Sequence, residues 1–403
     1  MTELLNELEL ERRDEQRRAL RALLMRPLLG QTESPEAFRL VRKHEDELRR
    51  RANELLGYRL VVRADHARLF RPASRLDATR PATIPIPGRP RDRWSSFTPR
   101  HYVFLYLILS LLEERHSLVQ LPLTELADEV GRLGIEIGTP IDFDRRQERR
   151  LFVEALRWLT DWRVVTVADG EHQESYVERG REGDCLLTVD QGRLGSLASA
   201  FRPLTEIASA ADLLHEGEYA PTDDGRRARI RHALARRLIE DPVVYVDELD
   251  EDERGYFLAQ RPTNLTKQIG DATGLRAEHR VEGSAFVDPE RRLTDTRFPD
   301  RGFDRQLPLL LCAALASALD AGRSELAFGE VRSLVRELLD HHRAHWPVDP
   351  DDLAGVEHVT GETLALLARM RLVEPVQLGV RVLPAVYRYR SPSIRTTKKG
   401  QEE

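Results

Sequence analysis

The stretch from Pro99 to Asp190 constrains the fold most, because the spacing of its apolar residues changes from a helical to a strand-like period. It opens with an apolar run from His101 to Leu112, followed by a short apolar segment at 118–123. From 123 to 130 the apolar residues recur at i, i+3, i+4 and i+7, which predicts one buried face of a helix. A third helix with its own apolar stripe is predicted after Asp144.

After this helix the residues alternate with the period of two that is typical of strands. The segments 163–167 and 185–189 predict the two strands of a hairpin, and Asp169 with Gly170 predicts a turn. The resulting order is helix, short strand, helix, helix, hairpin, which is the order of a winged helix. In this fold the third helix and the hairpin usually contact a partner surface or DNA.

The helix-then-hairpin pattern recurs along the chain. It predicts four units, near residues 36–71, 146–190, 227–259 and 353–389, of which two complete full winged helices. We therefore expect a mainly α fold with small β-hairpins (α+β), built from tandem winged-helix domains.

Breaks rich in proline, glycine and charge divide the chain. Residues 3–25 are predicted to form a charged helix, and residues 34–56 a second helix that precedes the first hairpin. The predicted boundaries are 1–92 for an N-terminal helical and hairpin region with a Pro-rich linker, 93–215 for a first winged-helix domain, 216–300 for a middle helix-hairpin region, 301–392 for a second winged-helix domain, and 393–403 for a flexible tail.

Composition restricts the compartment and the class of protein. With 403 residues, 41% of them hydrophobic and 32% charged, the chain can bury a sizeable core. Its two cysteines, Cys185 and Cys312, lie on apolar segments and are predicted to be buried free thiols, which fits a reducing cytoplasm. The apolar run at 102–112 is too short to span a bilayer, and the acidic N-terminus lacks the basic start of an export signal.

The sequence contains no catalytic motif that we can identify. The GxxxxGK[ST] phosphate loop, HExxH and GxSxG are all absent, so we expect neither an enzyme nor a bound cofactor. His341, His342 and His345 have no completing carboxylate or cysteine pattern nearby, so we predict no metal site there. An acidic run at 247–253, before a predicted strand at 255–259, is interpreted as a solvated hairpin turn that could meet a basic partner.

Two arginine clusters are the candidate DNA-binding residues, because arginines on one exposed face can contact successive phosphates. At the start of the helix after Asp144, Glu148 and Glu154 make internal ion pairing an equal alternative. The cluster between 226 and 239 contains no acidic residue and is the better candidate. The predicted DNA-binding residues are Arg226, Arg227, Arg229, Arg231, Arg236, Arg237, Arg145, Arg146, Arg149 and Arg150.

Segments 95–113, 152–165 and 384–389 resemble the KITE (MukE-like) subunits of Wadjet-type bacterial SMC complexes. The resemblance implies a non-catalytic subunit that forms a homodimer, binds a kleisin and an SMC ATPase, and helps to hold double-stranded DNA. It also implies that the complex extrudes DNA loops and defends the cell against plasmids, with cleavage done by a separate nuclease subunit. The protein would then be cytoplasmic and associated with nucleoid or plasmid DNA.

A winged-helix transcription regulator is the alternative. The predicted helix at 146–161 exposes mainly Arg, Glu and Asp, which favours contacts with phosphate or protein over base reading. We expect the homodimer to use apolar surface within residues 3–113. DNA binding is expected to be weak, salt-sensitive and sequence-independent. Reversing Arg229 and Arg236 to Glu is expected to lower it equally for unrelated sequences while leaving the fold and the dimer intact.

Overall fold

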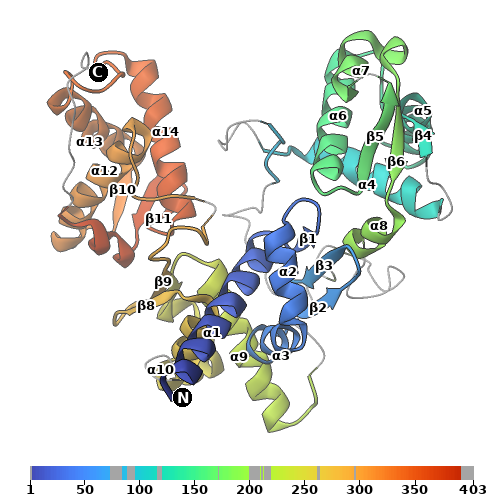
Figure 1. The fold of residues 1–403 in the computed structure, drawn as a ribbon. Coiled ribbons are helices and arrows are strands. Elements are labelled where there is room, and N and C mark those ends of the chain that lie inside the picture. The colour runs from blue at the N-terminus through green and yellow to red at the C-terminus, as the bar shows by residue number, and fades with distance from the viewer. Residues whose placement is uncertain are drawn as a thin grey trace.

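The computed structural model describes residues 2–72, 84–88, 96–115, 120–170, 172–198, 209, 212, 219–260, 264–294 and 296–391 (Figure 1). The chain is mainly helical, and its strands form small three-stranded antiparallel sheets. The described residues contain four such sheets, with the strand orders β1-β3-β2, β4-β6-β5, β7-β9-β8 and β10-β12-β11. In each sheet the strand that comes last in the sequence is the central strand. We number the four surrounding segments of chain units 1 to 4.

Unit 1 begins with the long charged helix predicted near the N-terminus. Its elements are α1 (Thr2–Met25), β1 (Leu28–Gly30), α2 (Pro35–Lys43), α3 (Glu45–Leu56), β2 (Arg59–Val62) and β3 (His66–Phe70). The predicted hairpin is confirmed, and β1 is an element that the sequence did not indicate. Strand β1 is buried along its length and pairs with β3 through Leu28 and Arg68.

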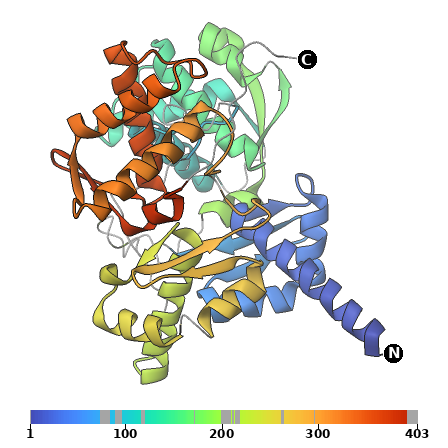
Figure 2. The same cartoon turned by 90° about the vertical axis from the view of Figure 1, so that its left-hand side faces the viewer.

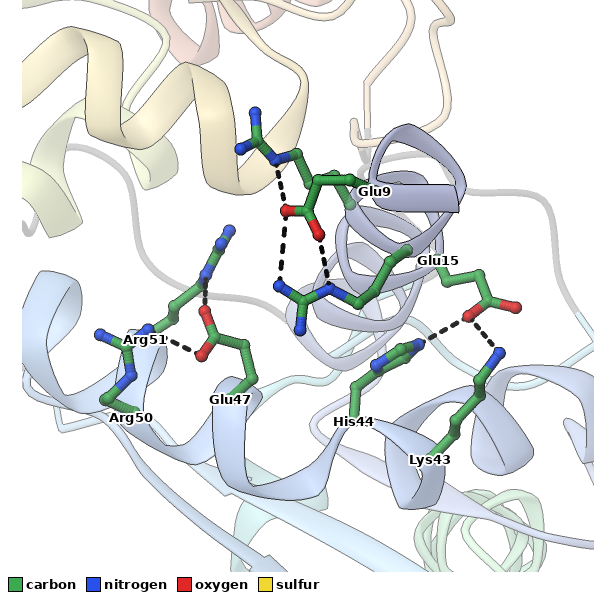
Figure 3. Close-up of polar contacts among 9 residues, drawn as sticks. Glu9, Glu15, Lys43, His44, Glu47, Arg50 and Arg51 are labelled. Atoms are coloured by element: carbon green, nitrogen blue, oxygen red, sulfur yellow. Dashed lines mark hydrogen bonds and ion pairs between the residues drawn. The ribbon is translucent and has the colours of Figure 1, made fainter. Parts of the chain in front are cut away.

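The single helix predicted over 34–56 is wrong, since α2 and α3 are separate helices that meet at His44. His44 Nε2 and Lys43 Nζ lie 2.7 and 2.6 Å from the buried Glu15 carboxylate of α1, as Figure 3 shows. Hydrogen bonds from Lys43 and then His44 lower the pKa of Glu15. The break between the helices is therefore tied to α1 by a charged contact.

Unit 2 contains the apolar run and the alternating segments identified above. Its elements are α4 (Pro99–Glu114), β4 (Gln120–Pro122), α5 (Leu123–Glu136), α6 (Arg146–Asp161), β5 (Val165–Gly170), α7 (Gln173–Arg179), β6 (Cys185–Val189) and α8 (Gln191–Ala198). The turn predicted at Asp169 and Gly170 is wrong, because β5 continues to Gly170 and pairs with Cys185 there. Helix α7 lies between the two strands instead.

Unit 3 differs most from the prediction. Its elements are α9 (Asp223–Glu240), β7 (Val244–Tyr245), α10 (Glu251–Gln260), α11 (Leu265–Thr273), β8 (Arg276–His279) and β9 (Gly283–Val287). Residues 255–259 belong to helix α10, so the predicted strand is wrong. Three acidic residues of the run at 247–253 occupy the first turn of α10, where the helix dipole favours negative charge. The hairpin of this unit is the later pair β8 and β9.

Unit 4 follows the order predicted for it. Its elements are α12 (Phe303–Asp320), β10 (Glu325–Ala327), α13 (Phe328–His341), α14 (Leu353–Arg369), β11 (Val373–Val376) and β12 (Gly379–Val382), followed by a short 3-10 helix, Pro384–Tyr389. Among the described residues, no helix has both the length and the apolar character needed to cross a bilayer. The predicted tail at 393–403 lies outside the described residues.

The cores do not follow the order of the chain. Buried residues of units 1 and 3 form a single cluster, which includes Leu48 of α3 and Leu234 of α9. Unit 2 has a separate core around Leu156, and unit 4 another around Leu315. Figures 1 and 2 both show units 1 and 3, in blue and yellow, side by side in the lower half of the molecule. Unit 2 is thus inserted in sequence between two units that fold against each other.

Candidate nucleic-acid interface

The first arginines of α9 are exposed and have acidic neighbours. Arg226 Nη2 lies 2.5 Å from Asp252 of α10, and Arg227 lies 3.8 Å from Asp224. Arg226 and Arg229 line an open depression at the start of the helix. Ion pairs between exposed groups contribute little to stability, so these guanidinium groups could exchange an acidic partner for a phosphate.

Arg236 is buried and holds the end of α3. Its Nε donates to the Leu56 carbonyl oxygen at 2.6 Å, and His232 Nε2 lies 3.1 Å from the Glu54 carbonyl oxygen. The last carbonyl groups of a helix lack intrahelical donors and favour a nearby cation. Arg236 is only 2% exposed, so in this fold it cannot reach a DNA phosphate. The expectation that Arg236 can be reversed to Glu without damage is wrong, because a carboxylate would face those carbonyl oxygens.

Arg237 pairs within the chain as well, and its main partners belong to the acidic run at 247–253. Arg237 Nη2 lies 3.1 Å from Glu248, which also pairs with Arg371 of unit 4. Arg231 is half-buried. The acidic run and the basic cluster that the sequence singled out are therefore each other's partners, through Asp252 and Arg226 as well as Glu248 and Arg237.

The cluster at the start of α6 is divided between structural and solvent-facing roles. Arg149 donates to the carbonyl oxygens of Phe143 and Val177, which ties the start of α6 to α7. Arg150 pairs with the buried Glu154. Arg145 pairs with Asp142 and Arg146 with Glu178, but both arginines remain more than half exposed, at 77% and 60% of their side-chain area. Arg145 and Arg146 are therefore the most exposed members of this cluster and the best placed to reach a partner.

The outer face of the unit 1 hairpin carries a basic surface that our sequence analysis did not select. The basic hairpin surface consists of Arg59, Arg63 and Arg68, arranged around Phe70. Arg59 lies opposite Phe70 across the strands, with its guanidinium carbon 4.1 Å from the ring centroid, and the Arg68 guanidinium lies 5.2 Å from the same ring. Arginine stacked on an aromatic ring is held in place. The Nε of Arg68 already donates to the Ser196 carbonyl oxygen of α8 at 3.2 Å, so Arg59 is the stacked arginine whose donors face solvent.

The electrostatics of this surface favour an anion. Arg59 and Arg63 are exposed, and neither forms an ion pair within the part of the chain that the structure describes. Burial lowers the pKa of Arg68 to about 10, with a smaller contribution from the neighbouring Arg71. Arg59, Val61 and Arg63 are spaced two residues apart, so both arginines lie on one face of the strand, and this was the signal available in the sequence.

Metal-binding chemistry finds no support in the described parts of the chain. No three His, Cys, Asp or Glu side chains there are grouped closely enough to hold a metal ion. His342 instead packs against Trp346, with ring centroids 4.5 Å apart, and burial followed by the neighbouring histidines lowers its pKa. Cys185 and Cys312 are buried and free, as predicted.

Comparison with known proteins gives a family but no named relative. No curated protein and no solved structure matches the sequence. A family model described as "Protein of unknown function (DUF2398)" matches residues 20–392, which include all four units apart from most of α1. The chain belongs to this family.

Proposed function

We propose that this chain is a non-catalytic, KITE-like accessory subunit of an SMC complex that binds the kleisin, the SMC ATPase and double-stranded DNA. The observation that carries the proposal is the repeated element order. Every unit has a helix, a short strand, two helices and an antiparallel pair of strands, which in unit 2 is interrupted by α7, and the last strand lies between the other two. We interpret each unit as a winged helix, twice as many as the two complete ones that the sequence indicated.

A string of winged helices supplies docking surface more readily than a reaction centre. The exposed arginines on unit 1 and at the start of α6 offer phosphate contacts without base reading. In the proposed complex the SMC ATPase supplies the energy for loop extrusion, a separate nuclease cleaves the DNA, and this subunit supports both by holding the kleisin and DNA. Its biological role would then be defence against plasmids.

The geometry argues against the transcription regulator. In units 1 and 3 the ends of the third helices, α3 and α11, are held by the other unit. The third helix of unit 4 exposes Glu357, His358 and Glu362, which are not suited to a major groove. These arrangements favour protein contacts over sequence-specific DNA recognition.

The test is reconstitution with the SMC and kleisin proteins encoded beside the gene. We expect the tagged chain to co-purify with both in one size-exclusion peak, and to hydrolyse neither ATP nor DNA when alone. The reconstituted complex should show ATPase activity that rises when DNA is added. Metal-dependent turnover by the isolated chain that is lost on point mutation would overturn the proposal, as would specific binding to one promoter with no affinity for a kleisin.

A further inference from the structure

The ends of the third helices indicate that the chain consists of two similar halves. In every unit the residue following the third helix, or following its C-cap, has a positive φ: 62° at Gly57, 55° at Arg163, 76° at Gly274 and 56° at Arg371. This left-handed conformation is the usual way to end a helix, and glycine adopts it without steric cost. Glycine occupies the position in units 1 and 3, and arginine occupies it in units 2 and 4. By this feature unit 1 resembles unit 3, and unit 2 resembles unit 4.

The contact between units 1 and 3 is reciprocal. As described above, His232 and Arg236 in the first helix of unit 3 hold the end of the third helix of unit 1. In return, the first helix of unit 1 holds the end of α11: Arg17 Nε donates to the Asp271 carbonyl oxygen at 2.9 Å, and Arg21 Nη1 to the Thr273 carbonyl oxygen at 3.4 Å. Both pairs of side chains are spaced i, i+4, and in both helices they lie eight and four residues before the last helical residue. In a two-fold interface the same contact occurs twice, once from each half to the other, and these two sets of contacts follow that pattern.

The outer units are attached in corresponding ways. Arg26, directly after α1, donates to the Asp161 carbonyl oxygen at the end of α6 and lies over the Trp162 ring. Tyr245, shortly after α9, donates its hydroxyl to the Arg371 carbonyl oxygen at 2.7 Å, just beyond the end of α14. In each half, a side chain that follows the first helix of the inner unit holds the third-helix end of the outer unit.

We propose that units 1–2 and units 3–4 are equivalent halves related by a pseudo-two-fold axis through the shared core, so that the chain carries its own dimer. The face that a second copy would need on unit 1 is covered by unit 3. The apolar residues that led us to expect a homodimer are largely used inside the chain: Leu20, Leu23 and Leu24 of α1 lie in the shared core. One copy therefore presents two like outer units and does not need a second copy. This inference is independent of the SMC assignment.

The first test is the mass of the intact protein. Multi-angle light scattering at micromolar concentration should give one chain, 46.2 kDa. A stable dimer of intact chains would overturn the proposal.

The second test asks whether the halves behave as a pair. A protease site is inserted into the full-length chain between Ala198 and Tyr219, and the purified protein is cleaved. The two halves should remain together in a 1:1 complex with the mass of the uncut chain. Their separation at micromolar concentration would contradict a self-contained dimer.

Matched variants of the cleavable chain test the pseudo-symmetry. Arg17→Ala with Arg21→Ala removes one reciprocal contact together with the ion pair of Arg21 with Asp288, and His232→Ala with Arg236→Ala removes the other reciprocal contact. We expect each pair of substitutions to weaken association of the halves at least tenfold, and the first pair to have the larger effect because it also removes that ion pair. The control, Arg12→Ala with Arg13→Ala, changes exposed arginines of α1 whose partner among the described residues is Glu9, and should leave association unchanged. An effect confined to one pair would show that the halves are not equivalent.

Discussion

Units 1 and 3 are built differently from units 2 and 4, although all four share one order of elements. In the inner pair, each helix that ends at a hairpin has its last carbonyl groups satisfied by the other unit, and the apolar side chains of both enter one core. Each outer unit closes its own core and touches the inner pair mainly through polar groups, such as Arg193 with Glu33 and Arg371 with Glu248. The difference separates the part of the chain that must fold as a whole from the parts that can fold alone.

The largest effect should come from the shared core. Leu234 in α9 is fully buried within it, and Leu234→Ala should lower the free energy of unfolding by about 3–5 kcal/mol. Because the core is common, unit 1 should lose stability together with unit 3. Leu156→Ala, at an equally buried position in unit 2, is the control.

The readout for these two variants is chemical denaturation followed by limited proteolysis. Leu234→Ala should expose cleavage sites in both unit 1 and unit 3, and Leu156→Ala only in unit 2. Protection of unit 1 in the Leu234→Ala variant would show that the inner units are separate.

Acid should weaken the inner pair through His232. Burial, more than any other cause, lowers the pKa of His232 to about 4 from 6.5. The unfolded chain therefore takes up a proton first as the pH falls. The contribution of neutral His232 to the free energy of unfolding is fully present above about pH 6.5. It is lost as the pH falls from there to about 4, and the total loss is about 3 kcal/mol. The difference in unfolding free energy between wild type and His232→Gln should narrow over this range, and a constant difference would refute the assignment.

A smaller loss is expected from Arg236→Ala. The variant leaves the Leu56 carbonyl oxygen without its charged donor, and hydrogen bonds to charged groups contribute about 1.5–3 kcal/mol. Thermal unfolding measured by circular dichroism provides the value. Arg227→Ala, on the exposed side of the same helix, is the control and should melt as wild type does.

The smallest effect concerns DNA. Replacing both Arg59 and Arg63 with Gln should reduce the slope of log affinity against log salt by about 1.8, since each phosphate contact contributes about 0.9. Fluorescence anisotropy with two unrelated duplexes measures it, and both should change equally. Arg12→Gln with Arg13→Gln is the control of equal charge. If the two pairs of substitutions act alike, the basic hairpin surface has no special role.

The division between inner units with a shared core and outer units with their own cores explains which features the sequence could predict. The helices and strands of unit 4 follow from apolar spacing, because side chains such as Val331 and Val335 pack within a locally built core. In α10, the run of Tyr256, Phe257 and Leu258 resembles a strand, yet Phe257 is buried in a core shared with unit 1. Periodicity in a short segment cannot report a partner so far away in the chain.

The selection of Arg236 as a DNA-binding residue was wrong for a similar reason. Arg236 and Arg227 each belong to an Arg-Arg pair in the same helix, and they differ because Arg236 meets a carbonyl group 180 residues away. Composition shows that a residue is charged but not whether its partner is a phosphate, a carboxylate or a helix end. Arg59 and Arg63 were passed over for the opposite reason, since they do not form a dense cluster in the sequence.

Native-state hydrogen exchange measured by mass spectrometry, over a series of denaturant concentrations below unfolding, tests the internal pairing most directly. Amides that open together form one cooperative unit. We predict that peptides from α1, α3, α9 and α11 lose protection with a single free energy and a single denaturant dependence, while peptides from α6 and from α14 each follow their own. Loss of protection in α3 at a denaturant concentration that leaves α9 and α11 fully protected would contradict it.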